Sequence, residues 1–201
     1  MRKLITYAAV ATASLVGAML IAAAPTWSAD KGGPVTRAEA EAMFPQSPWT
    51  AVYGSVSVGT GALTSDAIPI GIEGTAFGAR VGADVQISRV LFGVYTNYQW
   101  DHVSMFGGSV SPKEWLVAAR AGVLVTDHAL VYGLVGSNKL RISGMDTRGL
   151  ATGGGLEVAM TKNWRRGLEY QRTTYDDLPT FHEQVISARL IFAIPAYGLF
   201  R

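Results

Sequence analysis

The sequence predicts an all-β protein: an eight-stranded antiparallel up-and-down β-barrel that spans a membrane and follows a signal peptide and a short linker. Three observations predict this fold. Eight segments alternate between apolar and polar residues with period 2, the connections between them alternate between long and short, and charged residues share one face of the segments. The composition agrees, because 49% of the 201 residues are hydrophobic and only 16% are charged. Average soluble domains are about 25% charged.

The first 29 residues have the form of a secretory signal peptide. Residues 1–3 include two basic side chains, and residues 4–24 are an apolar run rich in alanine. The run approaches the length of a spanning helix, about 20 residues, so an uncleaved anchor is the alternative. The small residues favour the signal peptide. Two cleavage sites stay open, one after Ala24 and one after Ala29.

Residues 30–48 predict a periplasmic linker. Thr36 is a suitable N-cap for a short helix over residues 37–44, and Pro45 and Pro48 would end it. We favour a solvated linker over a plug or a partner-binding helix.

Residues 49–192 predict the barrel, and residues 193–201 a C-terminal tail. Most of the eight segments are close to the length that a tilted transmembrane strand needs, about 9–11 residues. The predicted strands are Trp49–Val58, Gly74–Ile87, Val90–Asp101, Glu114–Leu124, Ala129–Ser137, Leu150–Met160, Trp164–Thr173 and Glu183–Phe192.

The connections between these segments predict the orientation of the barrel. Outer-membrane barrels have short periplasmic turns and longer extracellular loops. The long connections are 59–73, 102–113, 138–149 and 174–182, and the short ones are 88–89, 125–128 and 161–163. We therefore expect both ends of the barrel sequence on the periplasmic side and four long loops outside the cell.

Alternation places ten charged residues in the lumen. Four are basic and six are acidic, which predicts ion pairs that neutralise one another, because an unpaired buried charge costs several kcal/mol. An eight-stranded barrel is just wide enough for side chains to fill, so we expect no wide pore. Alternation leaves the faces of the first and fifth strands undecided. The lumen residues are Arg80, Asp84, Asp101, Glu114, Arg120, Glu157, Arg165, Glu169, Glu183 and Arg189.

Aromatic and basic residues on the outward face support a membrane. Trp100, Trp115, Trp164 and Tyr170 stand near strand ends, as in the aromatic girdles at the two membrane interfaces. Arg172 would lie near the outer leaflet, where it can extend to solvent or pair with lipopolysaccharide phosphates. A soluble, lipocalin-like barrel is the alternative and would invert the two faces.

Two stretches carry a family resemblance. GLATGGGLEVAMTKNWRRGLEYQRTTYDD, residues 149–177, is similar to the penultimate hairpin of the opacity-type, surface-antigen family of small outer-membrane β-barrels, and PWTAVYGSVSVG, residues 48–59, is similar to its first strand. The resemblance implies a porin-like immunogenic protein of the cell outer membrane. It also implies a terminal aromatic residue that the barrel-assembly machinery recognises, here Phe192 or Phe200.

No strong catalytic motif is present, and we expect no cofactor and no metal. The net charge of +2 argues against nucleic acid as a partner. His102 and Ser104, with Glu114 as the acid, are the residue types of a lipid A deacylase, a weaker alternative. A surface metal site of His102, His128 and His182 with the nearby aspartates is also disfavoured against solvated loops.

The predicted function is structural: a barrel with a filled lumen that contributes to envelope integrity and presents surface loops. A small porin is the alternative. The expected partners are outer-membrane lipids, lipopolysaccharide and the barrel-assembly machinery, and the loops carry no readable code for a surface ligand.

Overall fold

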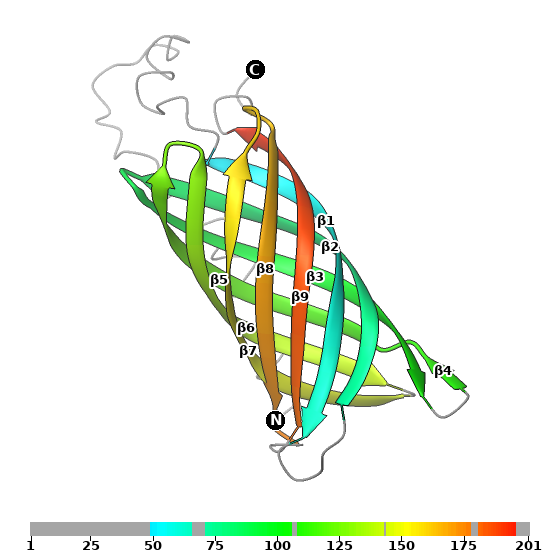
Figure 1. The fold of residues 1–201 in the computed structure, drawn as a ribbon. Coiled ribbons are helices and arrows are strands. Elements are labelled where there is room, and N and C mark those ends of the chain that lie inside the picture. Colours follow the sequence, from blue (N-terminus) through cyan, green and yellow to red (C-terminus); the bar gives the residue numbers. More distant parts are fainter. Residues whose placement is uncertain (1–48, 66–70, 106–107, 143, 178–180, 196–201) are drawn as a thin grey trace, which may run out of the picture. The chain divides into compact units, whose positions relative to one another are not determined.

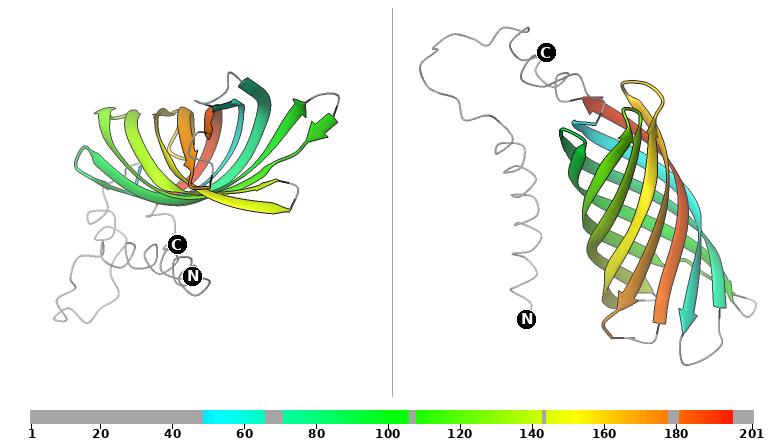
Figure 2. Two further views of the ribbon diagram at one scale, coloured as in Figure 1. Left: turned by 90° about the horizontal axis from the view of Figure 1, so that it is seen from below. Right: turned by 60° about the vertical axis from the view of Figure 1, so that its left-hand side comes forward.

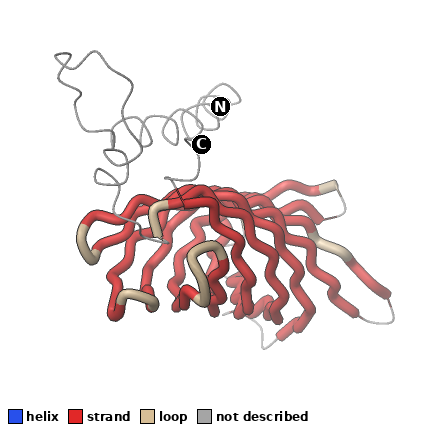
Figure 3. Tube along the Cα trace, turned by 90° about the horizontal axis from the view of Figure 1, so that it is seen from above, coloured by secondary structure: helices blue, strands red, loops and turns tan. Residues whose placement is uncertain are grey.

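The computed structural model describes residues 49–65, 71–105, 108–142, 144–177 and 181–195. These residues form strands joined by short connections (Figure 3). None of them forms a helix that is long and apolar enough to cross a membrane. The predicted signal peptide, the linker and Phe200 lie outside the described residues. The strands are β1 (Ala51–Ser65), β2 (Gly71–Ile87), β3 (Val90–Met105), β4 (Gly108–Val110), β5 (Lys113–Thr126), β6 (Ala129–Ile142), β7 (Met145–Ala159), β8 (Trp164–Tyr175) and β9 (Phe181–Pro195).

The sheet closes into an eight-stranded antiparallel barrel (Figure 1). Each barrel strand pairs with its sequence neighbours, and β1 pairs with β9 along its whole length, from Ala51↔Pro195 to Ser65↔Phe181. The short strand β4 pairs only with the end of β3 and extends one hairpin outward. The barrel strands tilt in the same sense around the barrel (Figure 2). The predicted fold class is confirmed.

The two ends of the barrel differ. One end, at the top of Figure 1, carries the tight connections 88–89, 127–128 and 160–163; we call it the turn end. Ser88 has a φ of 57°, the left-handed conformation that two-residue hairpin turns require. The opposite end, where β1, β3, β6 and β8 finish, is called the hairpin end.

At the hairpin end the strands are longer than predicted. The long connections expected at 59–73, 102–113 and 138–149 consist mostly of strand, and the one expected at 174–182 is strand at both of its ends, so the prediction of four long loops was wrong in their length. The β1–β2 ladder, for example, continues to Thr64↔Gly71. Alternation of apolar and polar residues with period 2 indicates a strand with one buried face and one exposed face. Where both faces of a strand are in water, its backbone hydrogen bonds continue although its residues no longer alternate between apolar and polar.

The last strand also extends beyond its predicted end. Proline lacks an N–H and cannot donate to a ladder, so within sheets it is confined to edges, first positions and bulges. The structure accommodates Pro195 as the final residue of β9, opposite Ala51, the first residue of β1. The ladder therefore ends at this proline.

The structure decides the faces of the two strands that alternation left open. Ala51 and Tyr53 on β1, and Leu130 and Tyr132 on β6, point into the barrel and are buried. Both strands have apolar residues on both faces, since Val56 and Val131, for example, are outward and exposed. The lumen is therefore partly apolar, so the two faces of these strands differ little in polarity.

Apolar side chains close the turn end of the lumen. Trp49, Leu91, Leu124, Leu130 and Ala159 belong to one buried cluster there. Trp49 is 1% exposed, and its indole Nε1 donates to the backbone oxygen of Asp127 in a turn. Trp49, two residues before β1, thus packs across the end of the barrel.

Candidate functional site

Arg120 on β5 forms the centre of the lumen. Its Nε and Nη2 donate to the two oxygens of Asp84 at 3.0 and 2.6 Å, and its Nη1 donates to Glu157 Oε1 at 2.6 Å. Arg165 provides a third hydrogen bond to Asp84, from Nη1 to Oδ2 at 3.0 Å. All four side chains are 0% exposed. A fork of parallel N–H donors facing a carboxylate is the strongest geometry for such a pair.

A second pair joins this centre to the rest of the lumen. Arg80 donates from Nη2 and Nη1 to the two oxygens of Glu169, at 2.7 and 3.2 Å. Arg189 contacts both acids, Glu169 Oε2 at 3.0 Å and Glu157 Oε1 at 3.3 Å. The Tyr132 hydroxyl donates to Glu169 Oε2 at 2.8 Å and accepts from Arg189. Four arginines and three carboxylates thereby form one buried network, which we call the arginine network.

Glycine residues allow these pairs to form across an intervening strand. Asp84 on β2 lies opposite Gly93 on β3, and Gly93 lies opposite Arg120 on β5. A Cβ at Gly93 would overlap Asp84 Oδ1, so a side chain there would occupy the space of the ion pair. The same arrangement recurs in Tyr132–Gly155–Glu169 and Glu157–Gly167–Arg189, where the glycine lies between the paired residues.

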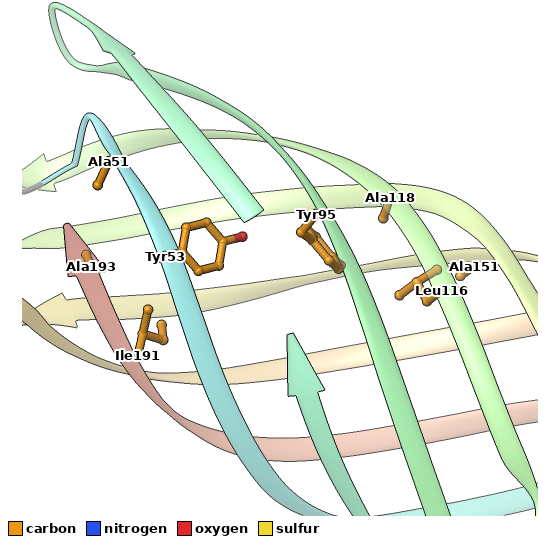
Figure 4. Packing of buried hydrophobic residues seen from close by; sticks show 8 residues of the cluster. All are labelled: Ala51, Tyr53, Tyr95, Leu116, Ala118, Ala151, Ile191 and Ala193. Atoms are coloured by element: carbon orange, nitrogen blue, oxygen red, sulfur yellow. The ribbon is translucent and has the colours of Figure 1, made fainter. Parts of the chain in front are cut away.

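Tyrosine rings surround the arginine network. The guanidinium carbon of Arg80 lies 3.8 Å from the centroid of the Tyr95 ring, and that of Arg120 lies 4.9 Å from Tyr53. Both rings lie inside the barrel in a buried cluster with Leu116 (Figure 4). Cations over ring faces are stabilised most when water is absent. No role was predicted for these tyrosines from the sequence; the available signal was that Tyr95 shares its face of the strand with Gln99 and Asp101.

Three of the ten predicted lumen residues lie outside the arginine network. Asp101, Glu114 and Glu183 form a separate group near the hairpin end, and one carboxylate oxygen from each lies within 4.8 Å of the others. The expected neutralisation by arginine is absent for these three, because no residue that the structure describes forms a salt bridge with them. We call them the acidic group.

The predicted aromatic residues form two clusters on the outward face. Trp100 and Trp115 pack edge to face against Tyr98, with ring centroids 5.3 and 6.3 Å apart, near the hairpin end. Trp164 packs in the same way against Phe192 at 5.1 Å, next to the 160–163 turn. These rings are exposed, as are the apolar side chains between them. Tyr170 is likewise exposed, and its hydroxyl donates to Gln184 at 3.0 Å.

The residues considered for catalysis do not form a triad. Glu114 points into the lumen and is 3% exposed. His102 is exposed on the outward face of β3, and the side chain of Ser104 lies outside the described part of the chain. The proposed pairing of His102 with Glu114 was therefore wrong, because alternation places the two side chains on opposite faces of the barrel wall.

The candidate histidine metal site is not assembled either. His128 lies in a turn at the turn end, whereas His102 and His182 lie near the hairpin end. The His182 ring nitrogen Nδ1 hydrogen-bonds to Thr174 at 3.1 Å. Three histidines on opposite ends of a barrel cannot share one ion.

Basic residues gather on the outward face at the hairpin end. Arg141 and Lys139 on β6 both contact Asp146 on β7, at 2.7 Å each, and Lys139 lies opposite Trp115 in the ladder. The two cations hold the pKa of the exposed Asp146 carboxyl below its usual range, chiefly through hydrogen bonds from Arg141 and Lys139. Arg148, opposite Lys139, and Arg172 on β8 are also exposed.

Comparisons with known proteins agree with this architecture. A family model described as outer membrane protein beta-barrel domain matches residues 11–192. No curated protein sequence matches the chain. Among solved structures, Neisserial surface protein A is 17% identical, with a TM-score of 0.51 over 71% of this chain and 97% of that one. Ail, the attachment invasion locus protein of Yersinia pestis, is 15% identical, with a TM-score of 0.50 over 71% and 98%. The outer membrane enzyme PagL is 14% identical, with a TM-score of 0.49 over 70% and 99%. At these identities the likeness concerns the fold.

Proposed function

Since the chain belongs to the outer membrane β-barrel protein family and resides in the outer membrane, we propose that it is a structural barrel that contributes to envelope integrity and presents its hairpins at the cell surface. The single observation that carries this proposal is the lumen. Side chains of the arginine network cross it from several strands, and the apolar cluster around Trp49 and Leu130 closes it at the turn end.

The lumen composition supports a stabilising role over a conducting one. A channel needs polar, hydrated space, and its charged residues line a path for ions. Here the side chains of Arg120 and Arg165 are 0% exposed, with their charges bound to Asp84 and Glu157. Leu91 and Leu130 are also 0% exposed. Opening a path would require breaking buried ion pairs, which is costly.

Conductance in planar lipid bilayers tests this proposal. We expect the refolded barrel, whose folding is checked by its heat-dependent gel mobility, to produce no discrete current steps. A general porin in the same bilayer serves as the positive control. Reproducible unitary steps from the folded protein would contradict the filled lumen and favour the alternative, a small porin.

We also propose that lipopolysaccharide contacts the barrel at the hairpin end. Outer-membrane barrels have their short turns in the periplasm. The hairpin end, opposite the turn end, therefore lies at the outer leaflet. Arg172 is exposed on the outward face, two residues beyond Tyr170 along β8. Its neighbours across the ladders are Thr152 and Gln184, so no opposite charge faces it there. A guanidinium at this level suits a phosphate group of lipid A.

Replacing Arg172 with alanine tests this contact. Basic residues near an anionic surface contribute about 1 kcal/mol each, so we expect Arg172→Ala to bind lipopolysaccharide about fivefold more weakly. The measurement is lipopolysaccharide binding to the barrel in detergent micelles. Arg166→Ala is the matched control, because Arg166 is exposed on the same face of β8 near the turn end. Equal binding by both variants would contradict the proposed site.

The last strand supplies a candidate assembly signal. Phe192 is outward and 43% exposed, packs on Trp164, and follows the outward Leu190 by two residues. We propose that the barrel-assembly machinery recognises this apolar face of β9. Its position three residues before the end of the strand leaves the aromatic ring in the apolar belt.

A further inference from the structure

The acidic group brings three carboxylates together from three strands. Asp101 is on β3, Glu114 on β5 and Glu183 on β9, and one oxygen of each lies within 4.8 Å of the others. Asp101 and Glu114 are 9% and 3% exposed. Glu183 is half-buried and faces the same space from the β9 side. The group lies near the hairpin end of the lumen.

No positive charge from the described residues compensates this group. The four lumen arginines bind Asp84, Glu157 and Glu169 instead. Like charges this close disfavour simultaneous ionisation, and burial increases the cost. The group therefore requires either shared protons or a bound cation.

Neutral donors orient the three carboxylates. Asn138 Nδ2 donates to Glu114 Oε2 at 2.7 Å, the Tyr175 hydroxyl donates to Glu183 Oε2 at 2.5 Å, and Gln99 Nε2 donates to Asp101 Oδ1 at 3.0 Å. In each carboxylate one oxygen thus accepts a hydrogen bond from a neutral donor. Neutral groups that hold ligand carboxylates in this way are typical of metal sites.

An independent observation comes from Asn138. This residue is 0% exposed and its amide is directed at Glu114, yet its Oδ1 has no hydrogen-bond partner. Glu114 Oε1 is also buried without a partner. Both atoms are acceptors. Buried acceptors without a donor are rare and costly, and a cation satisfies oxygen acceptors that the protein leaves without donors.

We propose that Asp101, Glu114 and Glu183 bind one divalent cation of the calcium type. Ca²⁺ binds six to eight oxygen ligands at about 2.3–2.6 Å. Two oxygen ligands of such an ion are therefore at most about 4.6–5.2 Å apart, and the three carboxylate oxygens, which all lie within 4.8 Å of one another, satisfy this limit. Water molecules would complete the coordination. The cation would link β3, β5 and β9 beyond the arginine network.

Calorimetric titration with Ca²⁺ alone tests the proposal. The full barrel is refolded in detergent micelles free of lipopolysaccharide, so that lipid phosphates contribute no ion sites, and is treated with EDTA. We expect one saturable site per barrel. Glu183→Gln removes one charge and keeps an oxygen, so binding should weaken at least tenfold. Asp146→Asn is the control, because it neutralises an exposed carboxylate outside the group and should leave binding unchanged.

Thermal unfolding of the same samples separates a cation from shared protons. With Ca²⁺ we expect the unfolding midpoint of the unsubstituted barrel to rise and that of Glu183→Gln to stay unchanged. In EDTA, Glu183→Gln should be at least as stable as the unsubstituted barrel, because one repelling charge is gone. Absence of saturable binding, or equal Ca²⁺ affinity in both proteins, would overturn the proposal. Glu114→Gln provides the same test if Glu183→Gln lacks the heat-dependent mobility of a folded barrel.

Discussion

Replacing Arg120 with methionine is expected to destabilise the barrel by about 3–5 kcal/mol, the range for breaking a buried ion pair from one side. Methionine keeps most of the volume of the side chain but none of its donors. Asp84 and Glu157, both 0% exposed, would lose their contacts of 2.6–3.0 Å with Arg120. The measurement is urea-dependent unfolding in phospholipid vesicles, followed by the heat-dependent shift in gel mobility.

Two comparisons show whether the uncompensated acids cause this loss. Combining Arg120→Met with Asp84→Asn and Glu157→Gln should recover a large part of the stability, because neutral amides no longer require the guanidinium. Lys139→Met, in an exposed pair with Asp146, should cost about 0–1 kcal/mol. Similar losses for Arg120→Met and Lys139→Met would show that the arginine network contributes little.

Placing an arginine on the membrane face should have the second largest effect. Leu168 lies on the outward face of β8, between Trp164 and Tyr170, and is 59% exposed. An arginine near the bilayer midplane costs about 2–4 kcal/mol in outer-membrane barrels. We expect Leu168→Arg to lose stability in this range when unfolding is measured in vesicles.

The control for this change is an exposed residue at the tip of the β6–β7 hairpin, at the lumen-facing parity of β7. Met145 is 74% exposed at the first position of β7 at the hairpin end, and Met145→Arg should change stability by no more than about 0.5 kcal/mol. The difference in unfolding free energy between the two variants shows whether Leu168 lies within the hydrocarbon layer. Equal, small effects would mean that water contacts both positions, as in a soluble barrel.

Alternation predicted the faces of those strands whose outward side chains contact lipid and whose inward side chains include charged residues. On β5, Glu114 and Arg120 point inward and Trp115 outward, as expected. On β1 and β6 the rule failed, because Tyr53 and Leu130 point into a lumen that is itself partly apolar. Period-2 alternation predicts the inward face only where the two faces of a strand differ in polarity, and the faces of these two strands do not.

The arrangement of the lumen charges could not be read from the chain. Sequence placed ten charged residues in one lumen, but pairing depends on strand register. Asp84 reaches Arg120 across Gly93 because the ladders place the three residues in one row. The neighbouring charges of Asp101 and Glu114 occupy a different level, and their partners include Asn138, which no charge pattern identifies.

The sequence by itself determined the fold class, the outer membrane as the location and the side of the barrel wall that most charges face, because lipid imposes a local, period-2 pattern on each strand. Only the tertiary structure decided which charges meet. It joined seven charged residues into the arginine network and left Asp101, Glu114 and Glu183 together without a counter-charge. The physical reason is that contacts across a lumen depend on register, tilt and the glycines between strands, which are properties of the closed barrel as a whole.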